Sequence, residues 1–392
     1  MPGSGFLSQK HGSDSRTCVG MFSGIGGLEL GLRSAGFEST IMCEIDSHAR
    51  DVLGVRFDKV EMVQDIQHLE VLPATHMLTA GFPCQDLSQA GRTRGITGAK
   101  SGIVERLFTL VETAPVRPEW MLIENVPFML KLGRGAAIAY VTSELERLGY
   151  TWAYRVVDSR AFGVPQRRRR VYLLASRTGD PRVIHIEDAG HQSEPVWDGG
   201  AVGFYWTEGN RGLGWAPGGI PTLKGGSGVG IPSAPAIWMP DGTIGTPDIR
   251  DAERLQGFAP GWTAPAEGVR GGFRWRLVGN AVTVPAAEWV GGIVSSPPTG
   301  SSSVGEPMGS SEPWPEAAWG AKGKRYKASC SAWPTLTPSK GIAEFLQLPL
   351  VPLSLRATAG FYSRLTRSTL RRPAEFDLAL ESHIELMQGV RP

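Results

Sequence analysis

The residues best suited to chemistry are a cysteine and a carboxylic acid, each at the end of a buried strand. Cys84 stands beside Pro83 in GFPCQDLS (81–88), directly after an apolar strand, and Glu124 ends the next apolar strand. Because ligands of an open α/β sheet bind at the carboxyl ends of its strands, we expect both side chains to project into one crevice. A nucleophilic thiol beside a carboxylic acid suits conjugate addition to an electron-poor ring, with the acid protonating a ring nitrogen.

The alternative for Cys84 is structural, because a lone cysteine is more often an inert buried hydrophobe than a nucleophile. Its polar loop favours an exposed, reactive thiolate. The other cysteines are Cys18, Cys43 and Cys330, and the four show neither paired spacing nor a CxxC motif. This pattern indicates a reducing cytosol and excludes a secreted disulfide scaffold, and no zinc-type Cys/His cluster predicts a metal site.

A glycine turn, FSGIGG (22–27), leads from a strand into a helix, without GxGxxG spacing or a P-loop lysine. Glu44 ends the next strand and could accept hydrogen bonds from a ribose diol. Asp65, in QDI, follows near the end of a further strand and could accept an adenine amino group. Together the three features suggest an adenosine-containing cofactor, although taken alone they are explained better by a helix cap and two solvated acids.

The elements that must position these residues alternate between short apolar strands and segments of helical periodicity. This alternation predicts an α/β fold with a mostly parallel sheet. No apolar stretch reaches the roughly 18–20 residues of a membrane span, and the N-terminus lacks the apolar core of a signal peptide. We expect strands at 18–22, 40–46, 76–81 and 120–126, and helices at 27–36, 102–114 and 135–148.

The second half of the chain has a different texture, rich in Gly, Pro and Trp between about residues 190 and 247. Helical periodicity returns briefly before a Ser/Pro/Gly-rich stretch that is typical of a linker. We expect a disordered leader (1–16), an α/β domain (17–175), a small irregular domain (176–248), a return segment completing the α/β domain (249–294), a linker (295–333) and a basic helical tail (334–392).

Charge is distributed unevenly over a chain of otherwise ordinary composition, with 392 residues, 41% hydrophobic and 20% charged. Residues 321–372 carry ten Lys or Arg and one acid, Glu344, whereas the rest is net acidic. The basic segment predicts a polyanionic partner. A helix at 354–371 would form either an accessory backbone contact to that partner or a solvated face on a docked helix. Its aligned arginines are Arg356, Arg364, Arg367 and Arg371.

Eight motifs follow one another in a set order: FSGIGG, Glu44, QDI, GFPCQDLS, ENV, QRRRR (166–170), RDAERLQGF (250–258) and GNAV (279–282). On these motifs the chain resembles the DNA (cytosine-5-)-methyltransferases of bacteria and bacteriophages from residue 17 to 293. The resemblance implies a Rossmann-like S-adenosylmethionine-dependent methyltransferase fold, with the target-recognition domain at about 176–248. It implies methyl transfer to C5 of a cytosine in a specific duplex DNA sequence, for restriction-modification or phage self-protection.

The resemblance also implies the roles of individual residues. Cys84 would attack C6 of a flipped cytosine, while Glu124 would bind N3 and the exocyclic amine and donate a proton. Arg170 would contact O2, and Arg168 would hold the flipped nucleotide's phosphate or the Cys84 loop. S-adenosylmethionine would be bound by Phe22, Gly24, Gly26, Glu44, Asp65, Ile66, Pro83, Asn280 and Val282. Substrate contacts and their supports would come from Gln85, Asn125, Gln166, Thr222 and Leu223.

Two other functions compete with DNA methylation. An RNA-methylating enzyme would keep the chemistry, but the Cys-Phe-Thr element typical of that branch is missing from the sequence. A DNA-binding protein without activity would be expected to lose Cys84 or Glu124, and the chain has both. We therefore expect a cytoplasmic, monomeric enzyme of double-stranded DNA, which a cognate restriction endonuclease could accompany.

Overall fold

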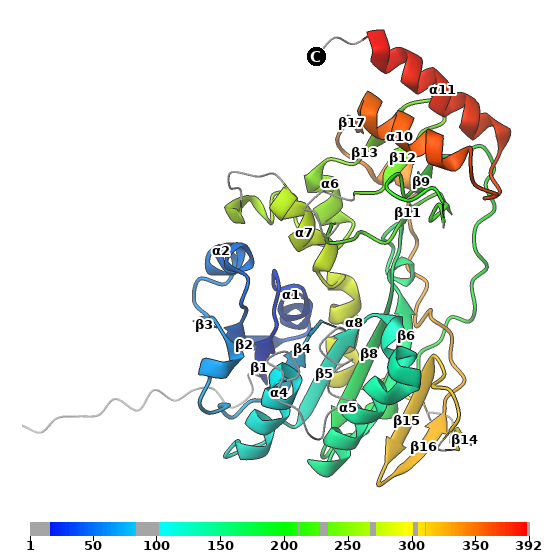
Figure 1. Cartoon of the computed structure of the whole chain (residues 1–392). Coiled ribbons are helices and arrows are strands. Elements are labelled where there is room, and N and C mark those ends of the chain that lie inside the picture. Colours follow the sequence, from blue (N-terminus) through cyan, green and yellow to red (C-terminus); the bar gives the residue numbers. More distant parts are fainter. Residues whose placement is uncertain are drawn as a thin grey trace, which may run out of the picture.

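The computed structural model describes residues 16–83, 102–210, 212–226, 234–266, 272–300, 305–309 and 311–389. These residues form a large lobe built on one broad sheet and a small lobe of short strands and helices (Figure 1). The loop with Cys84 and Gln85 lies outside the described residues. So does the predicted disordered leader, except for Arg16, which begins the first strand.

Ten strands of the described chain form the large-lobe sheet. One half is parallel, from β3 through β2, β1 and β4 to β5, and the strands beyond β5 are paired antiparallel. In spatial order they are β14 (Glu306–Pro307), β16 (Lys324–Lys327), β15 (Ala317–Ala321), β6 (Thr151–Asp158), β8 (Arg169–Ser176), β5 (Trp120–Asn125), β4 (Met77–Ala80), β1 (Arg16–Met21), β2 (Phe37–Cys43) and β3 (Glu61–Val63). The predicted α/β class is confirmed, and all four predicted strands lie in the parallel half.

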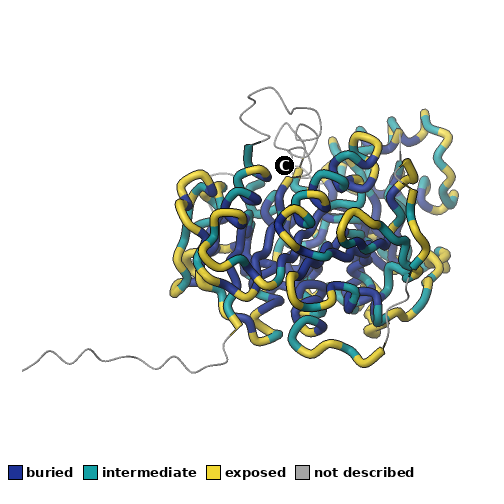
Figure 2. The backbone as a smooth tube through the Cα atoms, turned by 90° about the horizontal axis from the view of Figure 1, so that it is seen from below, coloured by how far each residue is buried: buried dark blue, intermediate teal, exposed yellow. Residues whose placement is uncertain are grey.

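Helices cover both faces of this sheet because its central strands are apolar on both sides. On one face, α4 (Gly102–Thr113) and α5 (Ala136–Arg147) pack against the strands. On the other, α1 (Gly27–Ser34) packs beside α8 (Val284–Ser295). The buried backbone in Figure 2 follows these layers, with exposed residues at the outer turns. The return segment containing α8 therefore completes the large lobe.

Further helices lie between these elements of the described chain. The α-helices are α2 (Ser47–Arg56), α6 (Ile249–Arg254), α7 (Gly272–Asn280) and α9 (Ile342–Phe345). The 3-10 helices are η1 (Ile66–His68), η2 (Pro127–Leu130), η3 (Leu132–Gly135), η4 (Ser159–Ala161), η5 (Pro181–His185) and η6 (Ala264–Ala266).

The small lobe is a second sheet covered by the C-terminal helices α10 (Leu355–Leu365) and α11 (Ala374–Gly389). Its buried centre is aromatic: Phe204 stacks on Phe361 at 5.3 Å and meets Phe376 edge-on at 4.9 Å. Such apolar contacts between distant segments hold the tail to the sheet. The strands in order are β10 (Ala216–Pro217), β9 (Val202–Phe204), β12 (Ala236–Trp238), β13 (Ile244–Thr246) and β17 (Val351–Pro352).

The segments after residue 295 differ from our expectations. Residues 295–333 are not simply a linker, because β14, β15 and β16 extend the large-lobe sheet beyond β6. Residues 334–392 are not a separate tail, because β17, α10 and α11 complete the small lobe. The helix expected at 354–371 ends at Leu365. Composition suggested a linker and a tail because these pieces bury their apolar residues only against partners far away in the sequence.

One stretch of the described chain, residues 272–295, has the length and composition of a membrane-spanning helix. Its apolar window is 72% buried inside the protein, and residues 281–283 interrupt it between α7 and α8. Burial of this kind is typical of a core helix.

Candidate active site

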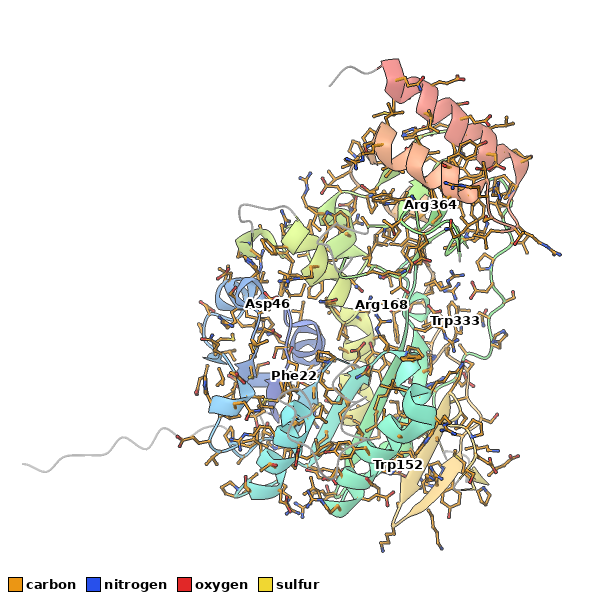
Figure 3. All side chains as sticks on the ribbon, viewed as in Figure 1. Phe22, Asp46, Trp152, Arg168, Trp333 and Arg364 are labelled. Carbon is orange, nitrogen blue, oxygen red and sulfur yellow. The ribbon has the colours of Figure 1, made fainter. Side chains whose placement is uncertain are left out.

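A cavity of 440 Å³ opens at the carboxyl ends of β1, β2, β4 and β5. Figure 3 shows Phe22, Asp46 and Arg168 along this edge of the large lobe, on the side that faces the small lobe. Several elements contribute its walls, as expected for a ligand site of an α/β sheet. The described residues that line it are Phe22, Gly24, Glu44, Ile45, Asp46, Ala49, Gly81, Phe82, Pro83, Glu124, Asn125, Val126, Arg168, Arg170, Leu277, Gly279, Asn280 and Ala281.

The glycine turn forms one wall of the cavity and has an unusual backbone. Phe22 has φ +58°, a conformation that bulky residues adopt only where the surroundings enforce it, and Gly24 has φ +55°. Gly26 has φ +83°, and a Cβ there would overlap the ring of Phe57. The turn therefore needs its glycines for conformation and for close packing.

Glu44 holds this turn from the end of β2. Its Oε2 accepts a hydrogen bond from Gly24 N at 2.7 Å, and its Oε1 accepts one from Asp46 N at 2.8 Å. Burial raises the pKa of Glu44, while these two backbone donors lower it. The carboxylate is fixed beside the cavity with lone pairs left for a further donor, as binding of a ribose diol requires.

Helix α7 closes another side through contacts with α2, which our sequence analysis missed. Arg276 donates a hydrogen bond to the carboxylate of Asp46, and the ring of Phe273 stacks on His48 with centroids 4.0 Å apart. Asp46 also accepts hydrogen bonds from His48 N and Ala49 N and so caps α2. An acid just before a helix was the one available signal, and it indicated a cap rather than a cavity wall.

Glu124 lies on the opposite wall, at the end of β5, and is 8% exposed. Its Oε1 lies 3.1 Å from Nε of Arg170 in an ion pair, but no group of the described chain donates a hydrogen bond to it. Burial raises the pKa of Glu124, and the guanidinium groups of Arg170 and Arg168 oppose that rise. A carboxyl group with a raised pKa can hold a proton to transfer.

Asn125 joins the end of β5 to the segment that precedes Cys84. Its Nδ2 donates to Phe82 O at 3.0 Å, and its Oδ1 accepts from Val126 N at 2.9 Å. Phe82 is buried, whereas Pro83 is exposed at the cavity. Asn125 thus fixes the chain just before the predicted nucleophile.

Arg168 is 1% exposed and has a role that the sequence did not predict. Its guanidinium donates to Leu223 O at 3.0 Å, Gly279 O at 3.2 Å and Ala281 O at 2.6 Å. Burial, followed by the charge of Arg170, lowers the pKa of Arg168 to about 9. The side chain therefore joins the segment after β11 to the return segment at the cavity.

The strand β7 (Gln166–Arg167) continues this junction by pairing in parallel with β11 (Ile220–Pro221). Gln166 accepts a hydrogen bond from Leu223 N at 2.9 Å and donates to Leu255 O at 2.8 Å. Thr222 Oγ1 donates to Arg167 O at 2.7 Å. Gln166, Thr222 and Leu223 are thus brought together, but as contacts between lobes rather than as lining of the cavity.

Four predicted cofactor residues, Gly26, Asp65, Ile66 and Val282, do not line the cavity in the described chain. Asp65 caps η1 by accepting from Gln67 N at 2.9 Å, and Ile66 packs into the core under the sheet. Val282 is buried against α1. Phe22, Gly24, Glu44, Pro83 and Asn280 do line it, whereas Gly26 in the glycine turn packs against Phe57.

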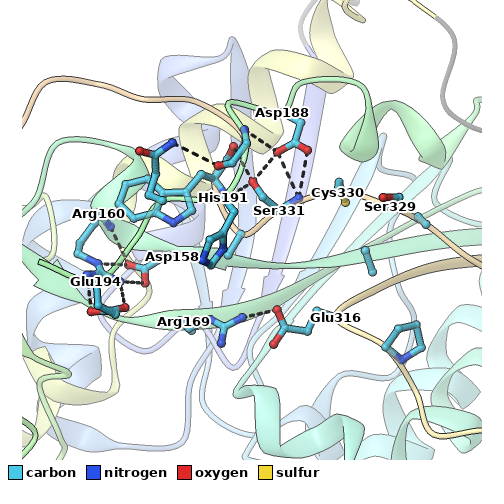
Figure 4. A pocket seen from close by; sticks show the side chains of 17 residues that line it. Asp158, Arg160, Arg169, Asp188, His191, Glu194, Glu316, Ser329, Cys330 and Ser331 are labelled. Carbon is cyan, nitrogen blue, oxygen red and sulfur yellow. Dashed lines mark hydrogen bonds and ion pairs between the residues drawn. The ribbon is translucent and has the colours of Figure 1, made fainter.

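A second, larger cavity of 620 Å³ lies between the ends of β6 and β8 and the segment after β16 (Figure 4). Its carboxylates all have partners. Arg160 pairs with Asp158 at 2.8 Å and with Glu194 at 2.7 Å. Arg169 pairs with Glu316 at 2.5 Å, and Asp188 accepts from Ser331 N at 3.1 Å. Its charged groups are explained by contacts within the protein. The described residues contain no cluster suited to a metal ion.

Comparisons with known proteins identify the class. A family model described as C-5 cytosine-specific DNA methylase matches residues 16–196. The chain is 50% identical over 367 residues to the type II methyltransferase M2.BsuMI of Bacillus subtilis (strain 168), covering 90% of this chain and 93% of that one. It is 34% identical over 181 residues to the type II methyltransferase M.BanI of Aneurinibacillus aneurinilyticus, covering 44% and 41% of the two chains.

The fold comparison agrees. The crystal structure of the S. pombe Dnmt2 methyltransferase matches with a TM-score of 0.54 at 17% identity, over 71% of this chain and 97% of that one, which shows a shared fold. Sheet, cavity and motifs define an enzyme of the methyltransferase class. The chain belongs to the C-5 cytosine-specific DNA methylase family, and it is a DNA (cytosine-5-)-methyltransferase of the restriction-modification type.

Proposed function

We propose that the chain transfers a methyl group from S-adenosylmethionine to C5 of a cytosine in one specific duplex DNA sequence. The observation that carries this proposal is the position of Glu44 and the Glu124–Arg170 pair on the walls of one cavity. One wall offers a carboxylate for a nucleoside, and the other offers a proton-holding carboxyl group for a base. We place this activity in modification for a restriction system or in phage self-protection, by a monomer in the cytoplasm.

The cavity residues fit the proposed cofactor. Both oxygens of Glu44 are oriented by backbone donors, so its free lone pairs suit the ribose hydroxyls. Phe22, Leu277 and Pro83 supply apolar surface for the adenine and the thioether portion. The cofactor supplies an electrophilic methyl group when bound. Gly24 and Asn280 would complete the pocket. Gly26, Asp65, Ile66 and Val282 do not line the cavity and would support the residues that do.

In the proposed reaction the Cys84 thiolate adds to C6 of the cytosine, and the ring electrons move toward C5 and N3. Glu124 donates its proton to N3 as the charge develops there. C5 would then take the methyl group as the bond between that methyl carbon and the sulfonium sulfur breaks, which leaves S-adenosylhomocysteine. Loss of the C5 proton to solvent and return of the N3 proton to Glu124 would restore the C5–C6 double bond and expel the Cys84 thiolate. This route follows the family resemblance and is supported by the raised pKa of Glu124.

The arginines and amides would support this reaction. Arg170, paired with Glu124, would contact the cytosine O2. Arg168 would hold the edge of the pocket through its three carbonyl contacts, with the phosphate contact as the alternative. Asn125 would position the Cys84 loop through Phe82.

The cytosine must leave the helix, because C6 cannot be attacked from above while the base is stacked. Unstacking costs about a few kcal/mol, which contacts to DNA phosphates can offset. Sequence choice would come from the small lobe, where Gln166 anchors the backbone of Leu223 next to Thr222. Gln85 would contact the substrate beside Cys84.

The proposal is tested by sequencing 5-methylcytosine at base resolution in DNA from a methylation-free bacterial host that expresses this chain. The Cys84→Ser variant is the control. We expect methylcytosine at one short recurring sequence, absent in the control. Unmodified DNA from cells with folded, S-adenosylmethionine-binding protein would overturn the DNA substrate and direct the assay to RNA.

A further inference from the structure

Glu29 is a buried carboxyl group that the reaction described above does not use. It lies in the first turn of α1, directly behind the glycine turn, and is 1% exposed. A Cβ at Gly20 in β1 would overlap Glu29 Oε1 and approach Ser23 Oγ at 2.6 Å. The glycine inside a strand thus makes room for the carboxyl group, since a strand interior otherwise disfavours glycine.

Two hydroxyl groups donate to the same oxygen of this carboxyl. Ser23 Oγ donates to Glu29 Oε1 at 3.2 Å, and Thr79 Oγ1 donates to it at 3.0 Å. Ser23 stands in the glycine turn between Phe22 and Gly24, both of which line the cavity. Thr79 lies in β4, which leads through Gly81 to Cys84. Glu29 therefore connects the cofactor wall to the strand that carries the predicted nucleophile.

The other oxygen, Oε2, is buried without a hydrogen-bond partner in the described chain. An orphaned buried polar atom is costly and needs an explanation. Burial raises the pKa of Glu29 to about 7, so the group is largely neutral below that pH. The backbone N–H of Glu29 itself and the hydroxyl groups of Thr79 and Ser23 lower that pKa, and the charge of Glu44 raises it. A hydrophobic residue would fill this place in the core more cheaply, so the carboxyl group is not explained by packing.

We propose that Glu29 is a positioning residue for methyl transfer, which holds the glycine turn through Ser23 and the nucleophile strand through Thr79. This inference rests on the proposed function. Each hydroxyl serves one partner of the reaction: Ser23 fixes the turn that receives S-adenosylmethionine, and Thr79 fixes the approach to Cys84. Removing one hydroxyl group therefore affects one step and leaves the other nearly unchanged.

The test compares Ser23→Ala and Thr79→Val in the full chain. Calorimetry measures the Kd of S-adenosylmethionine without DNA, and single-turnover kinetics measure methylation of unmethylated plasmid DNA at saturating cofactor. Loss of a buried hydrogen bond of about 1 kcal/mol corresponds to roughly a fivefold change. We expect Ser23→Ala to raise Kd roughly fivefold at a nearly unchanged rate. We expect Thr79→Val to lower the rate roughly fivefold at a nearly unchanged Kd.

Three further variants separate positioning from stability. Thr142→Val removes a buried hydroxyl group in α5 that bonds only its own helix, through Ile138 O and Ala139 O, and it should change thermal stability alone. Glu29→Gln keeps an acceptor oxygen and should stay within about threefold of the wild type, whereas Glu29→Ala should impair both Kd and rate. If Glu29→Ala does not fold, Ser23→Ala and Thr79→Val still test the proposal.

The inference is overturned if Ser23→Ala and Thr79→Val change only the melting temperature, as Thr142→Val does, or change Kd and rate together. It is also overturned if Glu29→Gln is as impaired as a folded Glu29→Ala. A wild-type protein that neither binds S-adenosylmethionine nor methylates DNA would instead overturn the proposed function. An active wild type with unaffected hydroxyl variants refutes the role of Glu29 alone.

Discussion

The two cavities beside β7 and β8 differ in how their charged groups are satisfied. The larger, of 620 Å³, is lined by carboxylates that all pair with arginines or backbone donors of this chain. The smaller, of 440 Å³, is lined by Glu124 and Arg168, each of which keeps a buried polar atom without a hydrogen bond. Volume alone would select the larger cavity.

Substrate chemistry is therefore to be expected at the cavity whose buried charged groups keep polar atoms without hydrogen-bond partners in the described chain. Unsatisfied buried groups cost free energy unless a ligand completes them, so they mark a functional site better than size does. Consecutive residues make the contrast sharp. Arg169 points to an exposed ion pair with Glu316, whereas Arg168 and Arg170 act at the smaller cavity. Three predictions use this contrast.

The largest effect should distinguish the carboxyl group of Glu124 at the smaller cavity from that of Glu316 at the larger one. Glu124→Gln removes the proton donor and should lower the single-turnover rate by about 10²–10⁴-fold. Glu316→Gln at the larger cavity should change that rate by less than about twofold, because it removes only an exposed ion pair. Equal losses in rapid-quench methylation assays would mean that the larger cavity takes part in the reaction.

A smaller effect should distinguish Arg168 from Arg169, and it concerns the free energy of unfolding. Arg168→Met leaves three buried carbonyl oxygens without their donor and removes a buried charge, so the free energy of unfolding should fall by about 2–4 kcal/mol. Arg169→Met should cost about 0–1 kcal/mol, since its partner is exposed. Denaturant titration measures both. Equal losses would show that burial at the smaller cavity confers no special role on Arg168.

The smallest effect concerns the pH dependence of the rate. Glu124 must be protonated to act as an acid, so the rate falls as pH rises through its raised pKa. Arg170 opposes that rise in pKa. Arg170→Gln should therefore move the descending limb of the pH–rate profile to higher pH, by about one unit. If the descending limb of the profile stayed in place or moved to lower pH, Glu124 would not be the acid of the reaction.

Much of the smaller cavity could be predicted from the sequence because its residues follow strand ends. The glycine turn, Glu44 and Glu124 all stand where apolar strands stop, and the sheet brings such ends together. Asp65 obeys the same rule, yet it caps η1, because the chain turns away directly after β3. Position at a strand end therefore marks a residue as a candidate for the cavity but does not by itself place it there.

The remaining features depend on contacts between distant segments. The carbonyl partners of Arg168 lie 55 to 113 residues away in sequence, and no local pattern indicates them. The same holds for Phe361 and Phe376, whose packing on Phe204 makes the tail part of the small lobe. Arg364 illustrates the consequence: expected on a basic face, it donates to Glu208 O and Trp206 O inside that lobe (Figure 3).

Covalent trapping tests the central claim, that methyl transfer occurs at the smaller cavity, most directly. Fluorine at C5 leaves no proton to be lost after methylation, so the attacking thiolate cannot depart. Duplex DNA amplified with 5-fluoro-deoxycytidine triphosphate should therefore form an adduct when S-adenosylmethionine is present, and peptide mass mapping should locate it. The account predicts attachment at Cys84. Attachment at Cys330, which lines the larger cavity, would contradict it, as would a lack of any adduct from protein that methylates ordinary DNA.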